Sequence, residues 1–161
     1  MISKGKSEKI IKKSSEGLDR LYKIVGIGTE NQTPKDRKQY ARDLSDILSF
    51  IQYELGDNTF FGGESLCLVD LMIWPLFERL PMLPILYPIE DMDIMGQHGK
   101  MSAWVENMKH VSSVEKYRLE PEQLATFYKD FANNKDIANF DSTSEDIAVN
   151  KFQETNHPGR Q

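Results

Sequence analysis

Apolar side chains recur every three or four positions through most of the first 131 residues, which is the spacing of one face of an amphipathic helix. The first run predicts a helix over about residues 7–27, which Gly26 and Gly28 end. A second run predicts a helix from Thr33, its capping residue, to Leu55. The short connection between the two favours an antiparallel pair.

The remaining apolar runs are shorter and are separated by irregular connections. They predict helices over about residues 67–80, 100–110, 112–118 and 121–131. Three prolines, at positions 81, 84 and 88, indicate irregular backbone after the first of these. No stretch alternates apolar and polar positions for long enough to form a strand. The sequence therefore predicts an all-α domain, a bundle of five to six helices within about residues 7–131.

The composition changes after about Asn133. Residues 134–161 are rich in Asn, Asp, Ser, Thr and Glu and offer little apolar surface to bury. No internal repeat divides the chain further. We therefore expect a helical domain over residues 1–133 and a flexible polar tail over residues 134–161.

The length, composition and net charge of the chain favour a soluble protein of one domain. The chain has 161 residues, of which 39% are hydrophobic and 28% charged, and its net charge is −5. Because charges of both signs are mixed, we expect neither nucleic acid nor an anionic membrane as partner, and the lysine-rich opening is interpreted as a solvated helix face. No apolar run reaches the roughly 18 residues of a membrane span, and the N-terminus lacks the apolar core of a secretory signal. A single cysteine excludes an intramolecular disulfide and suits a cytoplasmic location.

The stretch FFGGESLCLVDLMIWPLFERL, residues 60–80, keeps an acid and a proline inside an apolar run. We expect Asp70 to be the third residue of a helix and to accept hydrogen bonds from the free N–H groups of its first turn. Cys67 then takes the capping position, where a thiol is a poorer acceptor than a hydroxyl, and Ser65 is the alternative if the helix begins earlier. Pro75 predicts a bend in this helix.

Residues able to perform catalysis are few. A nucleophilic cysteine needs a lowered pKa, and burial beside Asp70 opposes the lowering that a helix start gives, so we assign Cys67 a structural role as part of the cap. The histidines His98, His110 and His157 show neither the spacing of metal ligands nor a paired nucleophile. We therefore expect no metal site and no catalytic triad in this chain.

The same stretch resembles the sixth helix of omega-class glutathione transferases. The resemblance lies in FFGG, in the cap formed by Cys67 and Asp70, and in the run WPLFER. LDRLYKIV, residues 18–25, looks like the end of the family's fourth helix, and MSAWVENMKHVSSVEKY, residues 101–117, resembles its seventh and eighth. The resemblance covers about residues 7–131 and implies the family's C-terminal helical domain.

The resemblance also implies a site. In this family the helical domain supplies one wall of the pocket that holds the electrophile. By resemblance, Arg79 lies near that wall, with Tyr22 and the aromatic residues Phe127, Tyr128 and Phe131 around it. The alternatives are ordinary core packing for each aromatic side chain and a salt bridge or helix-end contact for Arg79.

The family's thioredoxin-like domain, which holds glutathione and the nucleophilic cysteine, has no counterpart in this sequence, because no βαβ pattern occurs. We therefore expect a partial omega-like glutathione transferase, inactive alone. Joined to the thioredoxin-like domain, it would serve glutathione-dependent transferase or thiol reductase activity, such as dehydroascorbate reduction, with glutathione as co-substrate and small electrophiles as partners. The alternative is a non-catalytic helical module for protein association, with homodimerisation or self-association. A carrier of lipophilic molecules has less support.

Overall fold

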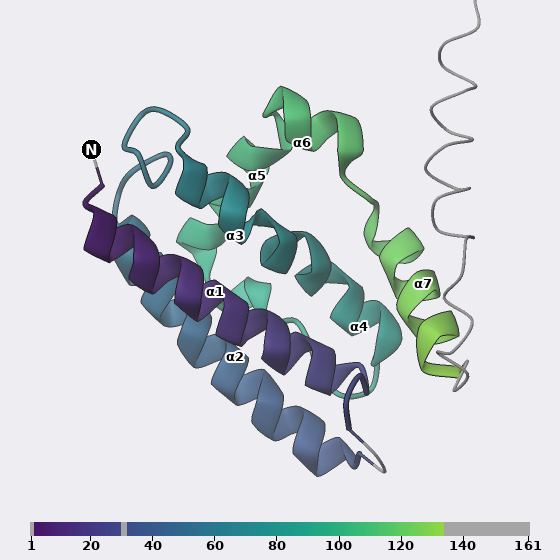
Figure 1. The fold of residues 1–161 in the computed structure, drawn as a ribbon. Helices are drawn as coiled ribbons and strands as arrows, with labels where there is room; N and C mark the ends of the chain where they lie inside the picture. Colours follow the sequence, from purple (N-terminus) through teal and green to yellow (C-terminus); the bar gives the residue numbers. More distant parts are fainter. Residues whose placement is uncertain (1, 30–31, 134–161) are drawn as a thin grey trace, which may run out of the picture.

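The computed structural model describes residues 2–29 and 32–133, and within them the fold is all-α (Figure 1). The expected tail, residues 134–161, lies outside the described residues. The elements, in chain order, are α1 (Lys4–Ile24), α2 (Pro34–Leu55), α3 (Leu68–Arg79), η1 (Leu80–Met82), α4 (Leu83–Leu86), η2 (Met95–Gln97), α5 (Gly99–Lys109), α6 (Ser112–Tyr117) and α7 (Pro121–Asn133).

The predicted fold class is confirmed. In the described part of the chain no strand forms, and the only sheet-like pairing is an isolated bridge between Phe60 and Gly63. Because α3, η1 and α4 follow one another without a break, they correspond to the single helix expected over 67–80 and a short extension of it. No helix in residues 2–29 and 32–133 is long and apolar enough to cross a membrane.

The antiparallel pair α1 and α2 forms one side of the molecule, and α3 packs against α1 (Figure 1). The start of α2 has the expected capping box: Asp36 N–H donates to the Thr33 hydroxyl, and Thr33 N–H donates to the Asp36 carboxylate. Gly17, buried on α1, is needed for close packing, because a Cβ there would lie 2.7 Å from Leu76 of α3. The missing side chain therefore lets α3 approach α1.

The core is centred on α3. Its buried face includes Ile73, Leu76 and Phe77, all at most 1% exposed. The indole of Trp104, from α5, lies 4.9 Å from the ring of Phe77 and 6.1 Å from that of Phe61, centroid to centroid. Burial of such side chains contributes about 1.5–3 kcal/mol each, so this cluster fixes α5 against α3.

Pro75 lies inside α3, which continues as an α-helix to Arg79 and then changes to 3₁₀ geometry at Leu80. The bend expected at Pro75 stays a prediction. At the far end of this segment, α7 packs beside η1 and α4, while α5 and α6 lie near the start of α3 (Figure 1).

Candidate functional site

An aromatic hollow opens where α7 packs beside the end of α1. It has a volume of about 190 Å³, and its lining is almost entirely apolar. The residues that line it are Tyr22, Ile27, Phe127, Tyr128 and Phe131. Four of the five side chains proposed from the sequence for the electrophile wall therefore meet in one place, and Ile27 was not foreseen.

The position of the hollow follows from the local sequence of α7. Pro121 begins this helix, and its buried face carries Leu124, Ala125 and Tyr128. Positions 127 and 131 are one turn apart on the same helix, and their rings are stacked with centroids 6.2 Å apart. Phe127 is 50% exposed whereas Tyr128 is only 6% exposed, so the hollow has an open rim and a buried floor.

Arg79 reaches the hollow through Tyr128 rather than lining it. This last residue of α3 donates from Nε to the Tyr128 hydroxyl at 3.0 Å and from Nη1 to the Pro75 carbonyl at 2.7 Å. Nη1 also lies 3.6 Å from a Glu78 carboxylate oxygen. The guanidinium is thus occupied by contacts at the helix end, and its role in the site is to fix the Tyr128 ring.

Tyr128 and Tyr22 form the floor, with ring centroids 6.2 Å apart. Burial raises the pKa of Tyr128, the hydrogen bond from Arg79 opposes this rise, and the Tyr22 hydroxyl adds to it. Tyr128 therefore stays a neutral phenol at physiological pH. A neutral Tyr128 phenol on this floor suits an apolar ligand group.

Asp70 is fully buried and connects three segments. Its carboxylate accepts hydrogen bonds from Cys67 N–H at 2.8 Å, Phe61 N–H at 2.9 Å and Trp104 Nε1–H at 2.9 Å. Of these three donors, only Cys67 N–H belongs to the start of the helix. The sequence predicted hydrogen bonds at the helix start and did not predict the other two. Asp70 also joins the FFGG loop and α5 to α3.

Cys67 stands at the N-cap of α3 and is partly exposed. Burial raises the pKa of its thiol, and the contact with the Asp70 carboxylate raises that pKa further. The thiolate, which is the nucleophilic form, is therefore disfavoured at neutral pH.

The structure describes two of the three histidines, His98 and His110. His98 is buried, with Nε2 3.1 Å from the Ser45 hydroxyl, and burial lowers its pKa. His110 is exposed, and His157 lies outside the described residues. Among residues 2–29 and 32–133 no cluster of His, Cys, Asp and Glu is placed to hold a metal ion.

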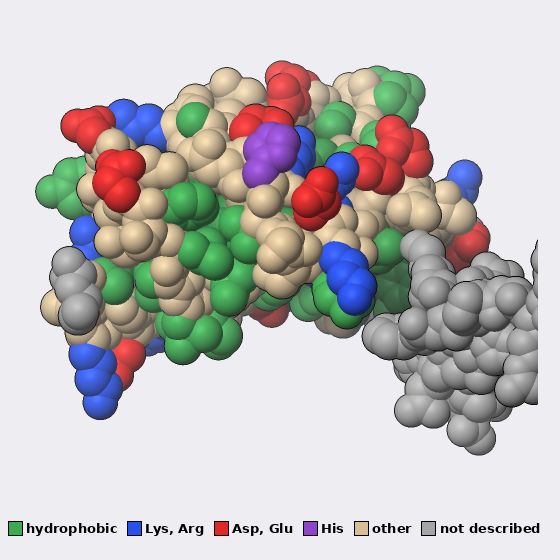
Figure 2. Space-filling view, turned by 90° about the horizontal axis from the view of Figure 1, so that it is seen from above, with side chains coloured by type: hydrophobic (Ala, Val, Ile, Leu, Met, Phe, Trp, Pro, Cys, Tyr) green, Lys and Arg blue, Asp and Glu red, His purple; other side chains and the backbone are tan. Residues whose placement is uncertain are grey.

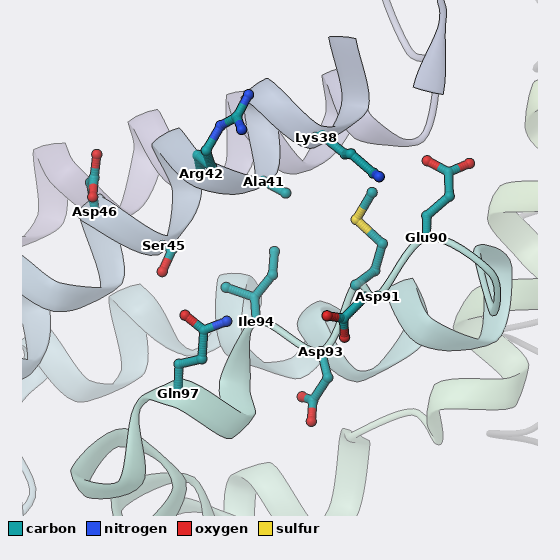
Figure 3. A pocket seen from close by; sticks show the side chains of 11 residues that line it. Lys38, Ala41, Arg42, Ser45, Asp46, Glu90, Asp91, Asp93, Ile94 and Gln97 are labelled. Carbon is teal, nitrogen blue, oxygen red and sulfur yellow. The ribbon is translucent and has the colours of Figure 1, made fainter. Parts of the chain in front are cut away.

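Two larger cavities in the described part of the chain were not foreseen from the sequence. One, of about 410 Å³, lies between α4 and α7 and shares Tyr128 with the aromatic hollow. The other is a groove of about 440 Å³ between α2 and the segment 90–97 (Figure 3). Both involve the proline-rich connection, whose path no periodic pattern predicts.

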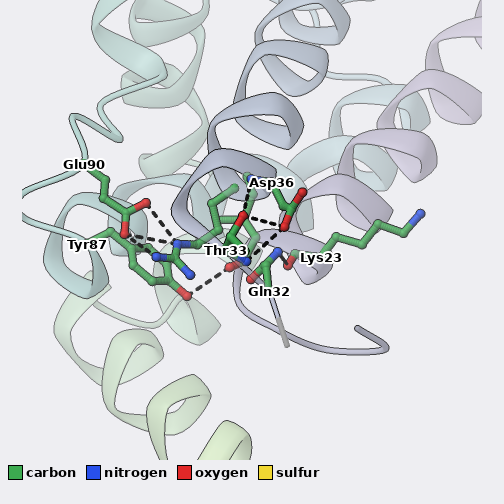
Figure 4. Close-up of polar contacts among 8 residues, drawn as sticks. Lys23, Gln32, Thr33, Asp36, Tyr87 and Glu90 are labelled. Atoms are coloured by element: carbon green, nitrogen blue, oxygen red, sulfur yellow. Dashed lines mark hydrogen bonds and ion pairs between the residues drawn. The ribbon is translucent and has the colours of Figure 1, made fainter. Parts of the chain in front are cut away.

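That connection is held to the helices by Tyr87 and Glu90 (Figure 4). The Tyr87 hydroxyl donates to the Ile24 carbonyl at 2.9 Å. Arg37, on α2, donates from Nε and Nη2 to the Glu90 carboxylate and lies over the Tyr87 ring, 4.8 Å from its centroid. The bond to Glu90 raises the pKa of Arg37. We call this group the Arg37 latch.

Comparison with known proteins agrees with this architecture. The chain is 33% identical over 91 residues to glutathione S-transferase omega-1 of Sus scrofa, covering 56% of this chain and 33% of that protein. It is 25% identical over 114 residues to glutathione S-transferase L3 of Arabidopsis thaliana, covering 69% of this chain and 47% of that protein. The crystal structure of rice GST1 in complex with glutathione superposes with a TM-score of 0.59 at 20% identity, covering 81% of this chain and 56% of that one.

The chain has the helical fold of the glutathione transferases. Its sequence is similar to omega-class and other members of that group, as the motifs in residues 60–80 indicate. The chain spans about a third to a half of the length of these curated relatives. No family model matches it.

Proposed function

We propose that the described helices are the C-terminal helical domain of an omega-like glutathione transferase and that the aromatic hollow holds the apolar group of the electrophile. The observation that carries this proposal is the meeting of Tyr22, Phe127, Tyr128 and Phe131 around one hollow. Its apolar lining excludes strongly solvated groups. An engineered apolar cavity of about 150 Å³ binds benzene, so a hollow of about 190 Å³ suits a group with a single ring.

In this proposal glutathione and its activation come from a thioredoxin-like domain, and the helical domain positions the electrophile. Cys67 does not supply the nucleophile, because its thiol is the N-cap of α3 and its pKa is raised. Transfer of glutathione to an electrophile and reduction of thiols, including a dehydroascorbate reductase-like reaction, are the candidate activities. A chain with a single cysteine suits a reducing compartment such as the cytoplasm.

Binding of a simple ring tests the hollow directly. We expect the 161-residue chain to bind fluorobenzene, followed by ¹⁹F NMR. Phe127→Ala and Phe131→Ala should each weaken binding by about 10-fold, because each removes an aromatic wall. Tyr53→Ala is the matched control, since Tyr53 is 80% exposed on α2 and should leave binding unchanged. Equal binding by all four proteins would show that the ring does not occupy the hollow.

Glutathione supplies the second part of the test. We expect that immobilised glutathione does not retain the chain and that the chain reduces no disulfide with it. A turnover that Cys67→Ala abolishes would contradict this expectation and would assign Cys67 the nucleophilic role. Turnover on addition of a separately produced thioredoxin-like domain, lost in Phe131→Ala, would support the division of labour proposed here.

A protein-association module is the second candidate, and a specific feature favours it. Leu68, Leu71 and Met72, on the first turns of α3, are 70%, 40% and 51% exposed. Figure 2 shows one face of the molecule on which hydrophobic side chains gather in the middle, between charged groups. The exposed apolar side chains of Leu68, Leu71 and Met72 are typical of an interaction surface. Homodimerisation through α3 would appear as a concentration-dependent mass in analytical ultracentrifugation, and Leu68→Gln together with Met72→Gln would reduce it.

A further inference from the structure

The groove between α2 and residues 90–97 combines an apolar floor with charged walls (Figure 3). Ala41 of α2 together with Met92 and Ile94 of the facing segment supplies the apolar part, and the last two are only 2% and 6% exposed. The volume of about 440 Å³ falls within the range of about 300–1,000 Å³ that is common for small-molecule sites. None of the residues that line this groove lines the aromatic hollow.

Two opposite charges on the walls have no protein partner. The Lys38 side chain extends from α2 toward the facing segment, and the Asp91 carboxylate lies on that segment (Figure 3). Within the described residues neither makes an ion pair or a side-chain hydrogen bond. A ligand that carries both charges would bind both groups without leaving either one unpaired.

Three neighbouring charged groups are already engaged in hydrogen bonds. The Glu90 carboxylate is held by Arg37, Asp93 accepts from Gly96 N–H at 3.0 Å, and Arg42 donates to the Gln39 amide oxygen at 3.0 Å. Asp46 also lines the groove, and its carboxylate points away from the segment that carries Asp91 (Figure 3). Lys38 and Asp91 are therefore the oppositely charged pair on facing walls whose charged atoms make no ion pair or hydrogen bond within the described residues.

The wall that carries Asp91 is held in place from both sides. Asp91 is the only non-glycine residue with positive φ in the described part of the chain, at 50°. The preceding residue is fixed by the Arg37 latch, and the following turn is closed by the bond from Gly96 to Asp93. Because the neighbours hold this uncommon backbone conformation, the backbone position from which the Asp91 side chain extends is fixed.

We propose that this groove binds a small zwitterion, namely a free α-amino acid with an apolar side chain. Its ammonium group pairs with the Asp91 carboxylate, and its carboxylate pairs with the Lys38 ammonium group. The side chain then covers Met92 and Ile94 on the apolar floor. The amide of Gln97, which points into the groove in Figure 3, is available to the polar atoms of the ligand.

L-Leucine is the probe, and its two singly charged derivatives are the controls. The test is an NMR titration of the 161-residue chain in which the amide signals of residues 38–46 and 91–97 are followed. We expect L-leucine to shift these signals saturably. N-acetyl-L-leucine lacks the ammonium group and L-leucinamide lacks the carboxylate, so each should bind about 10-fold more weakly. Equal binding of the three compounds would overturn the proposal, as would the absence of saturable shifts with leucine at tens of millimolar.

Matched variants locate the two contacts. Lys38→Gln and Asp91→Asn should each weaken leucine binding by about 10-fold, because each removes one charged partner. Asn tolerates positive φ at least as well as Asp, so the second variant keeps the backbone. Lys35→Gln is the control, since Lys35 is exposed on α2 and does not line the groove. Leucine binding that is unchanged in both groove variants would overturn the assignment.

Discussion

At the scale of single residues, Asp70 is the clearest case of a sequence feature whose full role depends on the fold. The spacing from Cys67 to Asp70 indicates a helix start, and the bond from Cys67 N–H is present. The indole of Trp104 and the backbone N–H of Phe61 also donate to this carboxylate, and both lie outside α3, in α5 and in the loop before α3. No local pattern pairs an acid with a tryptophan 34 residues later.

Removal of the Asp70 side chain should strongly destabilise the fold. Asp70→Ala leaves three N–H donors without their acceptor, and a buried unsatisfied group costs about 1–3 kcal/mol, so we expect a loss of about 3–5 kcal/mol in urea unfolding. Asp70→Asn keeps an acceptor oxygen and should lose less. Asp57→Ala is the control, because the Asp57 side chain is 95% exposed. A loss for Asp70→Ala no larger than for Asp57→Ala would show that these bonds contribute little.

At the scale of elements, the helices were predictable and their connections were not. Periodic apolar positions and the Thr33 cap are local signals, so they define α1, α2 and α3. The segment after Pro84 has no period. Its path is set by contacts with distant residues, above all Arg37 with Glu90, 53 positions apart. Both the groove between α2 and residues 90–97 and the cavity between α4 and α7 depend on this path, which explains why the sequence did not indicate them.

The Arg37 latch should control how often this segment opens. The side chains of Arg37 and Glu90 are only 15% and 17% exposed, so their ion pair is less screened by solvent than one on the surface. In Glu90→Gln we expect faster hydrogen–deuterium exchange across residues 88–97 and little change in α3. The exposed pair of Lys100 and Asp57 is the matched control, and Asp57→Asn should leave exchange in residues 88–97 unchanged. Unaltered exchange in Glu90→Gln would mean that the other contacts of the segment, such as the Tyr87 hydrogen bond and the buried Met92, hold it without the ion pair.

At the scale of the whole molecule, the aromatic hollow joins the two ends of the described chain. Tyr22 and Ile27 come from the first helix and its turn, whereas Phe127, Tyr128 and Phe131 come from the last helix. The periodicity of apolar positions could not predict this grouping, because it indicates which face of its helix each ring lies on and not which other helix that face contacts. The resemblance to glutathione transferases supplied the grouping and the expectation that Arg79 lies near it. Arg79 contacts this group through the Tyr128 hydroxyl and does not line the hollow itself.

The pH dependence of global stability should report on His98, which joins α5 to α2. Burial lowers its pKa below the usual 6.5, so the unfolded chain binds a proton more readily than the folded one. The stability contributed by neutral His98 is therefore complete above about pH 6.5 and is lost as pH falls through that value toward the lowered folded-state pKa. We expect His98→Asn to flatten the fall in unfolding free energy between about pH 7 and pH 5, measured in urea, whereas exposed His110→Asn should leave it unchanged. An equal fall in His98→Asn would assign the acid sensitivity to carboxylates instead.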